Sequence, residues 1–265
     1  YSMCGDPSDR SCYEIAVLLE PEGRGGSKLM QRIFEEGRRV FVSKPINHFA
    51  LEASASLSLL FGGGIGVTPM IAFAHELDSA GRNFKLMYSS STQASAAFDS
   101  DFEGQPWAKK CSKHYSDQGS RLDIASVVPP YEAGIHIYVC GPNAYMTAIL
   151  DHARFMGYPD VVLHAEFFVV PDMPDWVNFP FEIERNNGQK VSVSVDQSAS
   201  DALIAAGISV DVKCSDGLCG VCKCTLISGA VEHRDFVLSA AQRETTMILC
   251  QSRALQKNAV LKLDI

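Results

Sequence analysis

The stretch Cys214-Ser-Asp-Gly-Leu-Cys219-Gly-Val-Cys222 places three cysteines in the spacing C-x4-C-x2-C. A fourth cysteine, Cys250, follows after 27 intervening residues. Four thiolates at this spacing can surround two irons bridged by two sulfides, because a tight loop holds one side and a distant residue closes the other. The two glycines inside the loop allow it to bend and to direct backbone N–H groups toward sulfur.

This spacing is the plant-type [2Fe–2S] pattern. The alternative is a structural zinc site, which usually combines two C-x2-C knuckles, whereas this chain has one. Cys224 lies too close to Cys222 for a usual knuckle, and we expect its side chain to point away from the cluster. The sequence therefore predicts an iron–sulfur centre whose ligands are Cys214, Cys219, Cys222 and Cys250.

The composition excludes several classes of protein. The chain has 265 residues, 46% hydrophobic residues and a net charge of −8. The acidic balance and the absence of a Lys/Arg run argue against binding to nucleic acid or to anionic membranes. No stretch of 18 or more apolar residues predicts a membrane span. Nine cysteines, several of them clustered, favour a metal site in a reducing compartment over a secreted disulfide framework, so we expect a cytoplasmic protein.

Residues 1–52 are predicted to be rich in β-structure. The segments 13–19 and 38–43 carry β-branched residues in weak alternation and are strand candidates. The glycine-rich segment Gly23-Arg-Gly-Gly-Ser27 separates them. Since the chain begins at Tyr1, we expect further coding sequence upstream.

Residues 53–168 alternate strand and helix patterns. The strand candidates are 56–61, 84–88, 135–140 and 161–168, and the helix candidates are 69–80 and 143–157. For the first helix, Thr68 fits the N-cap, Pro69 the first position and Gly81 the position after the end. This alternation predicts an α/β domain with a parallel sheet and helices on both of its faces.

Residues 169–177 carry two prolines and are predicted to be a linker. Residues 178–265 are predicted to be a separate unit. It begins with a hairpin around Asn186-Asn-Gly-Gln189 and continues with a short helix over 198–206.

The segment Phe61-Gly-Gly-Gly-Ile-Gly-Val-Thr-Pro-Met70 joins a predicted strand to a predicted helix. Glycines at such a turn allow a phosphate to approach the backbone and the helix N-terminus. The spacing is not G-x-G-x-x-G, so the turn alone could be a purely structural feature. A second turn, Cys140-Gly-Pro142, also follows a parallel strand. Together the two turns predict a ligand site at the carboxyl edge of the sheet.

These motifs resemble those of the phthalate dioxygenase reductase-type family within the ferredoxin–NADP reductase superfamily, and the resemblance covers essentially the whole chain. Tyr1-Ser2 resembles the end of the family's flavin motif, and Gly23 to Ser27 its flavin-phosphate segment. Gly62 to Pro69 and Cys140 to Pro142 resemble its two nucleotide motifs. His164-Ala-Glu-Phe-Phe168 resembles the segment whose aromatic residue packs on the flavin ring.

The resemblance implies roles for individual residues. Tyr1 and Ser2 are expected to line the flavin ring, and Gly25, Gly26 and Ser27 to hold the FMN phosphate. The residues expected to bind or flank the nicotinamide nucleotide are Gly63, Gly64, Gly66, Thr68, Pro69, Cys140, Gly141 and Pro142. The residues expected at the reacting rings are Thr68, Cys140, Glu166 and Phe168, although Phe167 remains an alternative to Phe168.

The segment Ser89-Ser-Ser-Thr92 is expected to face the adenosine ribose. It contains no arginine that could bind a 2′-phosphate, which favours NADH. Lys85 and Lys109 leave NADPH open.

The resemblance therefore implies three modules: a partial flavin-binding β-barrel, a parallel-sheet nucleotide domain and a β-grasp ferredoxin domain. It implies a reductase that passes electrons from NADH through FMN to the cluster and on to a terminal Rieske-type oxygenase. Three alternatives remain: the reductase part of a self-sufficient P450 fusion, an electron carrier without NADH activity, and a zinc-stabilised binding protein.

Overall fold

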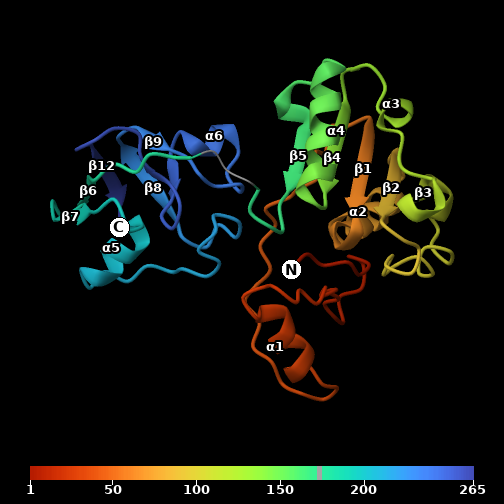
Figure 1. Cartoon of the computed structure of the whole chain (residues 1–265), viewed down its shortest axis with the longest axis horizontal. Coiled ribbons are helices and arrows are strands. Elements are labelled where there is room, and N and C mark those ends of the chain that lie inside the picture. Colours follow the sequence, from red (N-terminus) through yellow and green to blue (C-terminus); the bar gives the residue numbers. More distant parts are fainter. Residues whose placement is uncertain (172–174) are drawn as a thin grey trace. The chain divides into compact units, whose positions relative to one another are not determined.

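The computed structural model describes residues 1–171 and 175–265, and the chain divides into two compact units, 1–169 and 170–265 (Figure 1). The predicted linker 169–177 includes residues 172–174, which lie outside the described residues. Each unit is described by itself.

Residues 1–52 contain one helix, α1 (Gly26–Ile33), and an isolated β-bridge between Met3 and Ile15. The strand predictions for 13–19 and 38–43 are wrong. A strand is stabilised by pairing with a neighbour, and neither segment has a partner strand within the described part of the chain. Most of their apolar side chains are exposed, and Phe41 is fully exposed. The expected partial barrel therefore does not form a sheet in residues 1–52.

The rest of the first unit is built on a five-stranded parallel sheet with the order β3-β2-β1-β4-β5. Its strands are β1 (Leu57–Gly63), β2 (Phe84–Ser90), β3 (Cys111–Tyr115), β4 (Ile135–Cys140) and β5 (Leu163–Glu166). Its α-helices are α2 (Val67–Ser79), α3 (Ile124–Val127) and α4 (Asn143–Phe155). The 3-10 helices are η1 (Gly64–Gly66), η2 (Ala108–Lys110), η3 (Ser116–Gln118) and η4 (Asp160–Val162).

Both faces of this sheet are covered, as predicted. Leu60 of β1 packs in one apolar cluster with α2 residues, including Met70 and Phe73. Its neighbours Leu59 and Phe61 pack in a second cluster with α4 residues. This division follows the alternation of side chains along a strand, and it explains why β1 is a continuous apolar run.

Helix α2 begins slightly earlier than predicted. Gly66 stands at the N-cap because η1 runs directly into the helix. Thr68 is therefore already helical, and its Oγ1 donates a hydrogen bond to the carbonyl of Ile65 at 3.0 Å instead of capping. The end of the helix is as predicted, since Ala80 is the C-cap and Gly81 follows it.

The second unit has a five-stranded mixed sheet with the order β10-β8-β12-β6-β7 and a small antiparallel pair, β11-β9. Its strands are β6 (Phe181–Arg185), β7 (Lys190–Val193), β8 (Lys223–Ser228), β9 (Val231–Glu232), β10 (Thr246–Ile248), β11 (Arg253–Ala254) and β12 (Val260–Asp264). Its helices are α5 (Ala199–Ala205) and α6 (Ala240–Arg243). The predicted hairpin is confirmed as β6 and β7, and the predicted short helix as α5. The separate sheet and the parallel sheet of the first unit match the predicted mixed fold class.

No helix among the described residues is both long enough and apolar enough to cross a bilayer.

A pair of histidines links two strands of the parallel sheet. Nδ1 of His136 on β4 lies 2.9 Å from Nε2 of His164 on β5. The His164 ring also stacks on Tyr138, with 4.5 Å between ring centroids. Burial, followed by the neighbouring His136, lowers the pKa of His164 to about 4, and burial also lowers the pKa of His136. Both rings are therefore neutral at neutral pH.

The substitution His164→Phe is expected to flatten the pH dependence of the first unit's stability. Because folding lowers the pKa of His164, the unfolded state binds the proton more readily as pH falls below about 6.5, and stability is lost toward pH 4. After allowing for solvent screening of this half-buried ring, we expect a loss of about 1 kcal/mol between pH 7 and pH 5 in the wild type. Hydrogen exchange of the β4 amides at both pH values measures this loss. An identical loss in the variant would contradict the assignment.

Candidate cofactor-binding sites

The predicted site residues of the first unit come together at the carboxyl edge of the parallel sheet. The strand register aligns Gly62 of β1 with Cys140 of β4, and Cys140 with Glu166 of β5. Three separate motifs of the sequence therefore meet in one row. In open parallel sheets this edge is where ligands bind.

The two glycine-containing turns are in direct backbone contact. A Cβ on Gly66 would lie 2.5 Å from the carbonyl carbon and oxygen of Cys140, which no side chain can tolerate. A Cβ on Gly141 would lie 2.9 Å from Cα of Gly63. By contrast, nothing lies within 4 Å of the Cβ position of Gly64. The result is a cradle of bare backbone next to the start of α2, which suits the phosphates of a dinucleotide.

Three of the residues predicted to bind the nucleotide are buried under this edge and do not face solvent. Thr68 and Cys140 are fully buried, and Pro69 is also buried. Thr68 holds the turn through its bond to Ile65. Burial, followed by the charge of Glu166, raises the pKa of the Cys140 thiol, so it stays protonated at neutral pH. Pro142 is exposed beside the cradle.

The N-terminal residues reach the same edge. Ser2 Oγ donates a hydrogen bond of 2.6 Å to Oε2 of Glu166, and this contact spans 164 positions of sequence. Burial raises the pKa of Glu166, while the bond from Ser2 opposes the rise. Tyr1 is exposed.

The structure separates the two candidate ring-packing residues. Phe167 packs against the apolar cluster that includes α4, whereas the side chain of Phe168 is 36% exposed. This arrangement favours Phe168 over Phe167 as the residue available to cover a bound ring.

The segment expected to hold the FMN phosphate forms the start of α1. Gly25 is its N-cap without a side-chain capping bond, and open space surrounds the Cβ positions of Gly25 and Gly26. Ser27 Oγ accepts a hydrogen bond from the backbone N–H of Glu20 at 3.0 Å. An uncapped helix start with open flanks suits a phosphate. Helix α1 buries none of its residues, so the structure does not bring this segment into the core beside Glu166.

In the second unit the four predicted ligand cysteines form two interacting pairs. The thiol of Cys214 contacts that of Cys219, and the thiol of Cys222 contacts that of Cys250. No group of three or more metal-ligating side chains gathers at a single point in residues 1–171 and 175–265. Two pairs suit a centre with two irons, because each iron takes two thiolates besides the bridging sulfides.

Backbone N–H groups point at these sulfurs. The N–H of Asp216 lies 3.4 Å from Sγ of Cys214. For Cys214, burial raises the pKa, but this N–H and the contact with Cys219 outweigh it and the pKa falls. The contact with Cys250, assisted by backbone N–H groups, lowers the pKa of Cys222. In the same pairs, burial raises the pKa of Cys219, and the contact with Cys222 raises the pKa of Cys250. Within each pair, therefore, only Cys214 and Cys222 are favoured as thiolates. Hydrogen bonds to ligand sulfurs also tune a cluster's potential.

Cys224 has a different environment. Its Sγ donates to the carbonyl of Asp264 on β12 at 3.5 Å, and burial raises its pKa to about 11. This thiol is therefore bonded within the sheet.

Residues 183–255 match the family of 2Fe-2S iron-sulfur cluster binding domains. Over 276 aligned residues the chain is 37% identical to the vanillate O-demethylase oxidoreductase of Pseudomonas sp. (strain HR199 / DSM 7063), with 100% of this chain and 84% of the relative covered. The solved structure of phthalate dioxygenase reductase has a TM-score of 0.67 and 33% identity, covering 100% of this chain and 83% of that one. The chain belongs to the phthalate dioxygenase reductase-type family. It is also similar to part of an intact type IV self-sufficient cytochrome P450 monooxygenase, with a TM-score of 0.87, 33% identity and full coverage of this chain, which spans 35% of that much longer chain.

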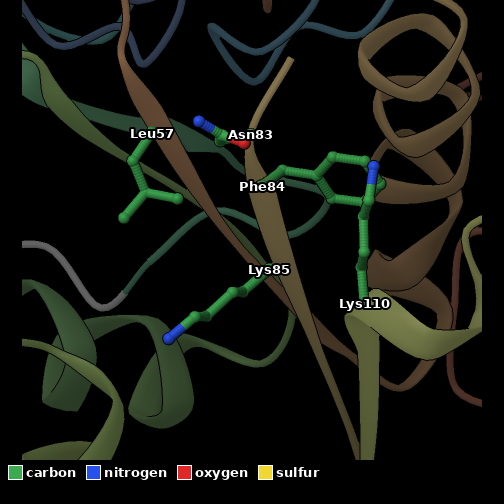
Figure 2. A pocket seen from close by; sticks show the side chains of 5 residues that line it. All are labelled: Leu57, Asn83, Phe84, Lys85 and Lys110. Atoms are coloured by element: carbon green, nitrogen blue, oxygen red, sulfur yellow. The ribbon is translucent and has the colours of Figure 1, made fainter. Parts of the chain in front are cut away.

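A pocket lies at the amino edge of the parallel sheet, opposite to the carboxyl edge that carries the glycine turns. Leu57, Asn83, Phe84, Lys85 and Lys110 line it, at the amino ends of β1 and β2 (Figure 2). Lys110 lies over the Phe84 ring at 4.7 Å and pairs with Asp78 at 2.6 Å. Lys85 is thus at the end of β2 opposite to Ser89, and Lys109 precedes β3 at its amino end. Neither lysine is placed to bind a 2′-phosphate beside Ser89–Thr92.

Gly66→Ala is expected to destabilise the first unit of this reductase by about 1–3 kcal/mol, because the new methyl group overlaps the Cys140 carbonyl. Gly104→Ala is a matched control, since nothing lies within 4 Å of its Cβ position. Urea unfolding followed by tryptophan fluorescence compares the two, since Trp107 is buried in this unit. Equal stabilities would contradict the described contact between the turns.

Cys250→Ser is expected to reduce iron and sulfide retention more than tenfold, because it removes one thiol of a contacting pair. Cys224→Ser removes a thiol that is bonded to Asp264 and should retain the full iron content. Iron and sulfide analysis of the purified proteins, with visible spectra, makes the comparison. Iron loss in the Cys224 variant alone would reverse the assignment of the fourth ligand.

Proposed function

We propose that this chain is the reductase component of an oxygenase system. It takes electrons from NADH, passes them through FMN to a plant-type [2Fe–2S] cluster, and delivers them to a terminal oxygenase of the Rieske type. The observation that carries the proposal is the presence, in one chain of this family, of both the backbone cradle at Gly63–Gly66 and the two thiol pairs. A nucleotide site and a cluster site in one chain are what such a reductase requires.

The chain's own residues bind and orient the cofactors. The contacting turns of β1 and β4 would hold the phosphates of NADH, and the uncapped start of α1 at Gly25–Ser27 would hold the FMN phosphate. Ser2 positions Glu166 through its hydrogen bond, and the exposed side chain of Phe168 would cover the flavin ring when FMN is bound. When bound, FMN supplies the change from two-electron hydride transfer to one-electron transfer. Cys214, Cys219, Cys222 and Cys250 hold the two irons.

NADH is favoured over NADPH. The loop after β2 is a network of hydroxyl groups in which Ser95 Oγ bonds to Ser90 at 2.9 Å and to the Thr92 hydroxyl at 2.9 Å. Hydroxyl groups suit the free ribose hydroxyls of NADH, whereas a 2′-phosphate needs a cation. The two lysines that left NADPH open lie at the other end of the strands.

The proposed domain organisation follows from these sites. Residues 1–52 contribute to flavin binding, 53–168 bind the nucleotide, 169–177 connect the units, and 178–265 hold the cluster. Because thiolate ligands and a low-potential cluster need a reducing compartment, we place the protein in the cytoplasm.

One alternative has specific support. The likeness to a self-sufficient P450 monooxygenase favours a reductase that serves a haem domain of the same polypeptide. The cofactor chemistry of this chain is the same in both cases, and the identity of the electron acceptor separates them. Reduction of a separately purified Rieske oxygenase supports the main proposal.

An anaerobic visible spectrum of the purified full-length protein, before and after NADH, tests the proposal. Flavin and iron–sulfur absorption should both appear, and both should bleach within seconds of NADH addition. A colourless protein that contains zinc would overturn the proposal. Cluster absorption without flavin, unchanged by NADH, would instead support a simple electron carrier.

A further inference from the structure

A buried arginine in the second unit connects the beginning of that unit to the cluster-binding region. Arg234 is only 7% exposed. Its Nη1 donates to Oδ1 of Asn178 at 2.7 Å, and its Nε donates to Oε2 of Glu232 at 2.7 Å. The guanidinium carbon lies 4.7 Å from the centre of the Trp176 ring, and Nη2 donates to the carbonyl of Val177 at 3.4 Å. One side chain thus contacts three consecutive residues of the segment 176–178.

The backbone of Arg234 lies against the cysteine loop. A Cβ on Gly217, within that loop, would lie 3.3 Å from the Arg234 carbonyl oxygen. The N–H of Phe236 donates to the carbonyl of Gly217 at 3.1 Å. On the other side, the N–H of Arg234 donates to Oγ of Ser252 at 3.3 Å, two residues after Cys250. Arg234 therefore joins segment 176–178 to both sequence regions that supply cysteines.

A second buried arginine extends this attachment. Arg253 on β11 is opposite Glu232 on β9, and its Nη2 donates to the carbonyl of Phe179 at 3.1 Å. Its Nη1 donates to the carbonyl of Gln197 at 2.7 Å. Arg253 in the pair β9-β11 and the neighbouring Arg234 therefore hold residues 176–179. These residues directly precede the first strand of the sheet, which begins at Phe181.

The geometry needs arginine. Three hydrogen bonds in different directions and contact with an aromatic ring use the planar fork of a guanidinium, which a lysine ammonium cannot reproduce. A guanidinium this buried is stable only when its donors are paired. The attachment of segment 176–178 is therefore a specific feature of the unit.

We propose that Arg234 is a positioning residue for electron transfer between the FMN and the cluster. By binding Trp176–Asn178 beside the cysteine loop, it makes the connection between the units end at Trp176 instead of at Phe181. Residues 176–180 are therefore held against the second unit instead of lengthening the connection that precedes its first strand. Since effective concentration falls as a connection between two modules lengthens, keeping residues 176–180 out of that connection raises the encounter of the two cofactors. This inference rests on the proposed function.

The test compares three variants of the full chain. Arg234→Met removes the fork, and Asn178→Ala removes one of its partners while leaving Arg234 and the cysteine loop in place. Arg185→Met is the matched control, because Arg185 donates to Gln189 within the β6–β7 hairpin. Visible and EPR spectra and the cluster potential establish that each variant has an intact cluster, and Asn178→Ala serves if Arg234→Met fails to fold.

The first readout does not depend on activity. Chymotrypsin cleavage after Trp176, followed by mass spectrometry, is expected to be about tenfold faster in Arg234→Met and Asn178→Ala than in the wild type, because loss of a charged hydrogen bond frees the segment. Arg185→Met should match the wild type. Equal cleavage rates in all four proteins would overturn the attachment.

The second readout is anaerobic stopped-flow reduction by NADH. Flavin reduction should keep its rate in every variant, whereas cluster reduction should slow about twofold or more in Arg234→Met and Asn178→Ala only. Unchanged cluster reduction together with faster cleavage would overturn the positioning role. A wild-type protein whose flavin does not accept electrons from NADH would remove the proposed function, and the cleavage result would still decide the attachment.

Discussion

The close contact between two backbone turns is the constraint on which the first unit's site depends. Gly66 lies directly on the Cys140 carbonyl, and Gly141 lies on Gly63, so the ends of β1 and β4 touch without any intervening side chain. This contact aligns the start of α2 with the carboxyl edge of the sheet. At the same edge, the pairing of β4 with β5 places Cys140 beside Glu166, to which Ser2 is bonded. A side chain at either glycine would separate the turns and remove the open backbone surface that a phosphate needs.

The parts of the fold that could be predicted from sequence are those with short-range signals. The parallel sheet follows from apolar runs such as Leu57–Gly63 alternating with helices, and the hairpin of the second unit from the Asn-Gly turn at 187–188. The cysteine spacing predicted the four candidate ligands, and the structure brings them into contacting pairs. The first two cases depend on local patterns, whereas the contact between Cys222 and Cys250 joins residues that are far apart in the sequence and was predicted from their spacing. The prediction that Cys224 is not a ligand fits its bond to Asp264.

The remaining features depend on contacts between distant parts of the chain. Segments 13–19 and 38–43 have strand composition, but a strand needs a partner strand. Within the described residues neither segment belongs to a sheet, and Ile15 makes only an isolated bridge with Met3. The histidine pair joins two strands whose spacing along the chain carries no motif. The role of Arg234 likewise could not be predicted from the sequence, because its partners Asn178 and Trp176 lie more than 50 residues away. Such contacts become visible only when the register and the packing are known.

Both cofactor sites are built mainly from backbone, glycine and thiols, with few titratable groups at the reacting edge. Electron and hydride transfer need no acid–base residue that changes its protonation state, so the protein has to position its cofactors and exclude alternatives. The buried groups agree with this requirement. The Cys140 thiol and the His136–His164 pair are held neutral, while the charged Arg234 and Arg253 donate hydrogen bonds that order residues 176–179. Charge is therefore used where a segment must be held in place. At the ligand-binding edge, where cofactors bring their own charges, the chain presents mainly uncharged backbone, and Glu166 is the acidic side chain in the row beside Cys140.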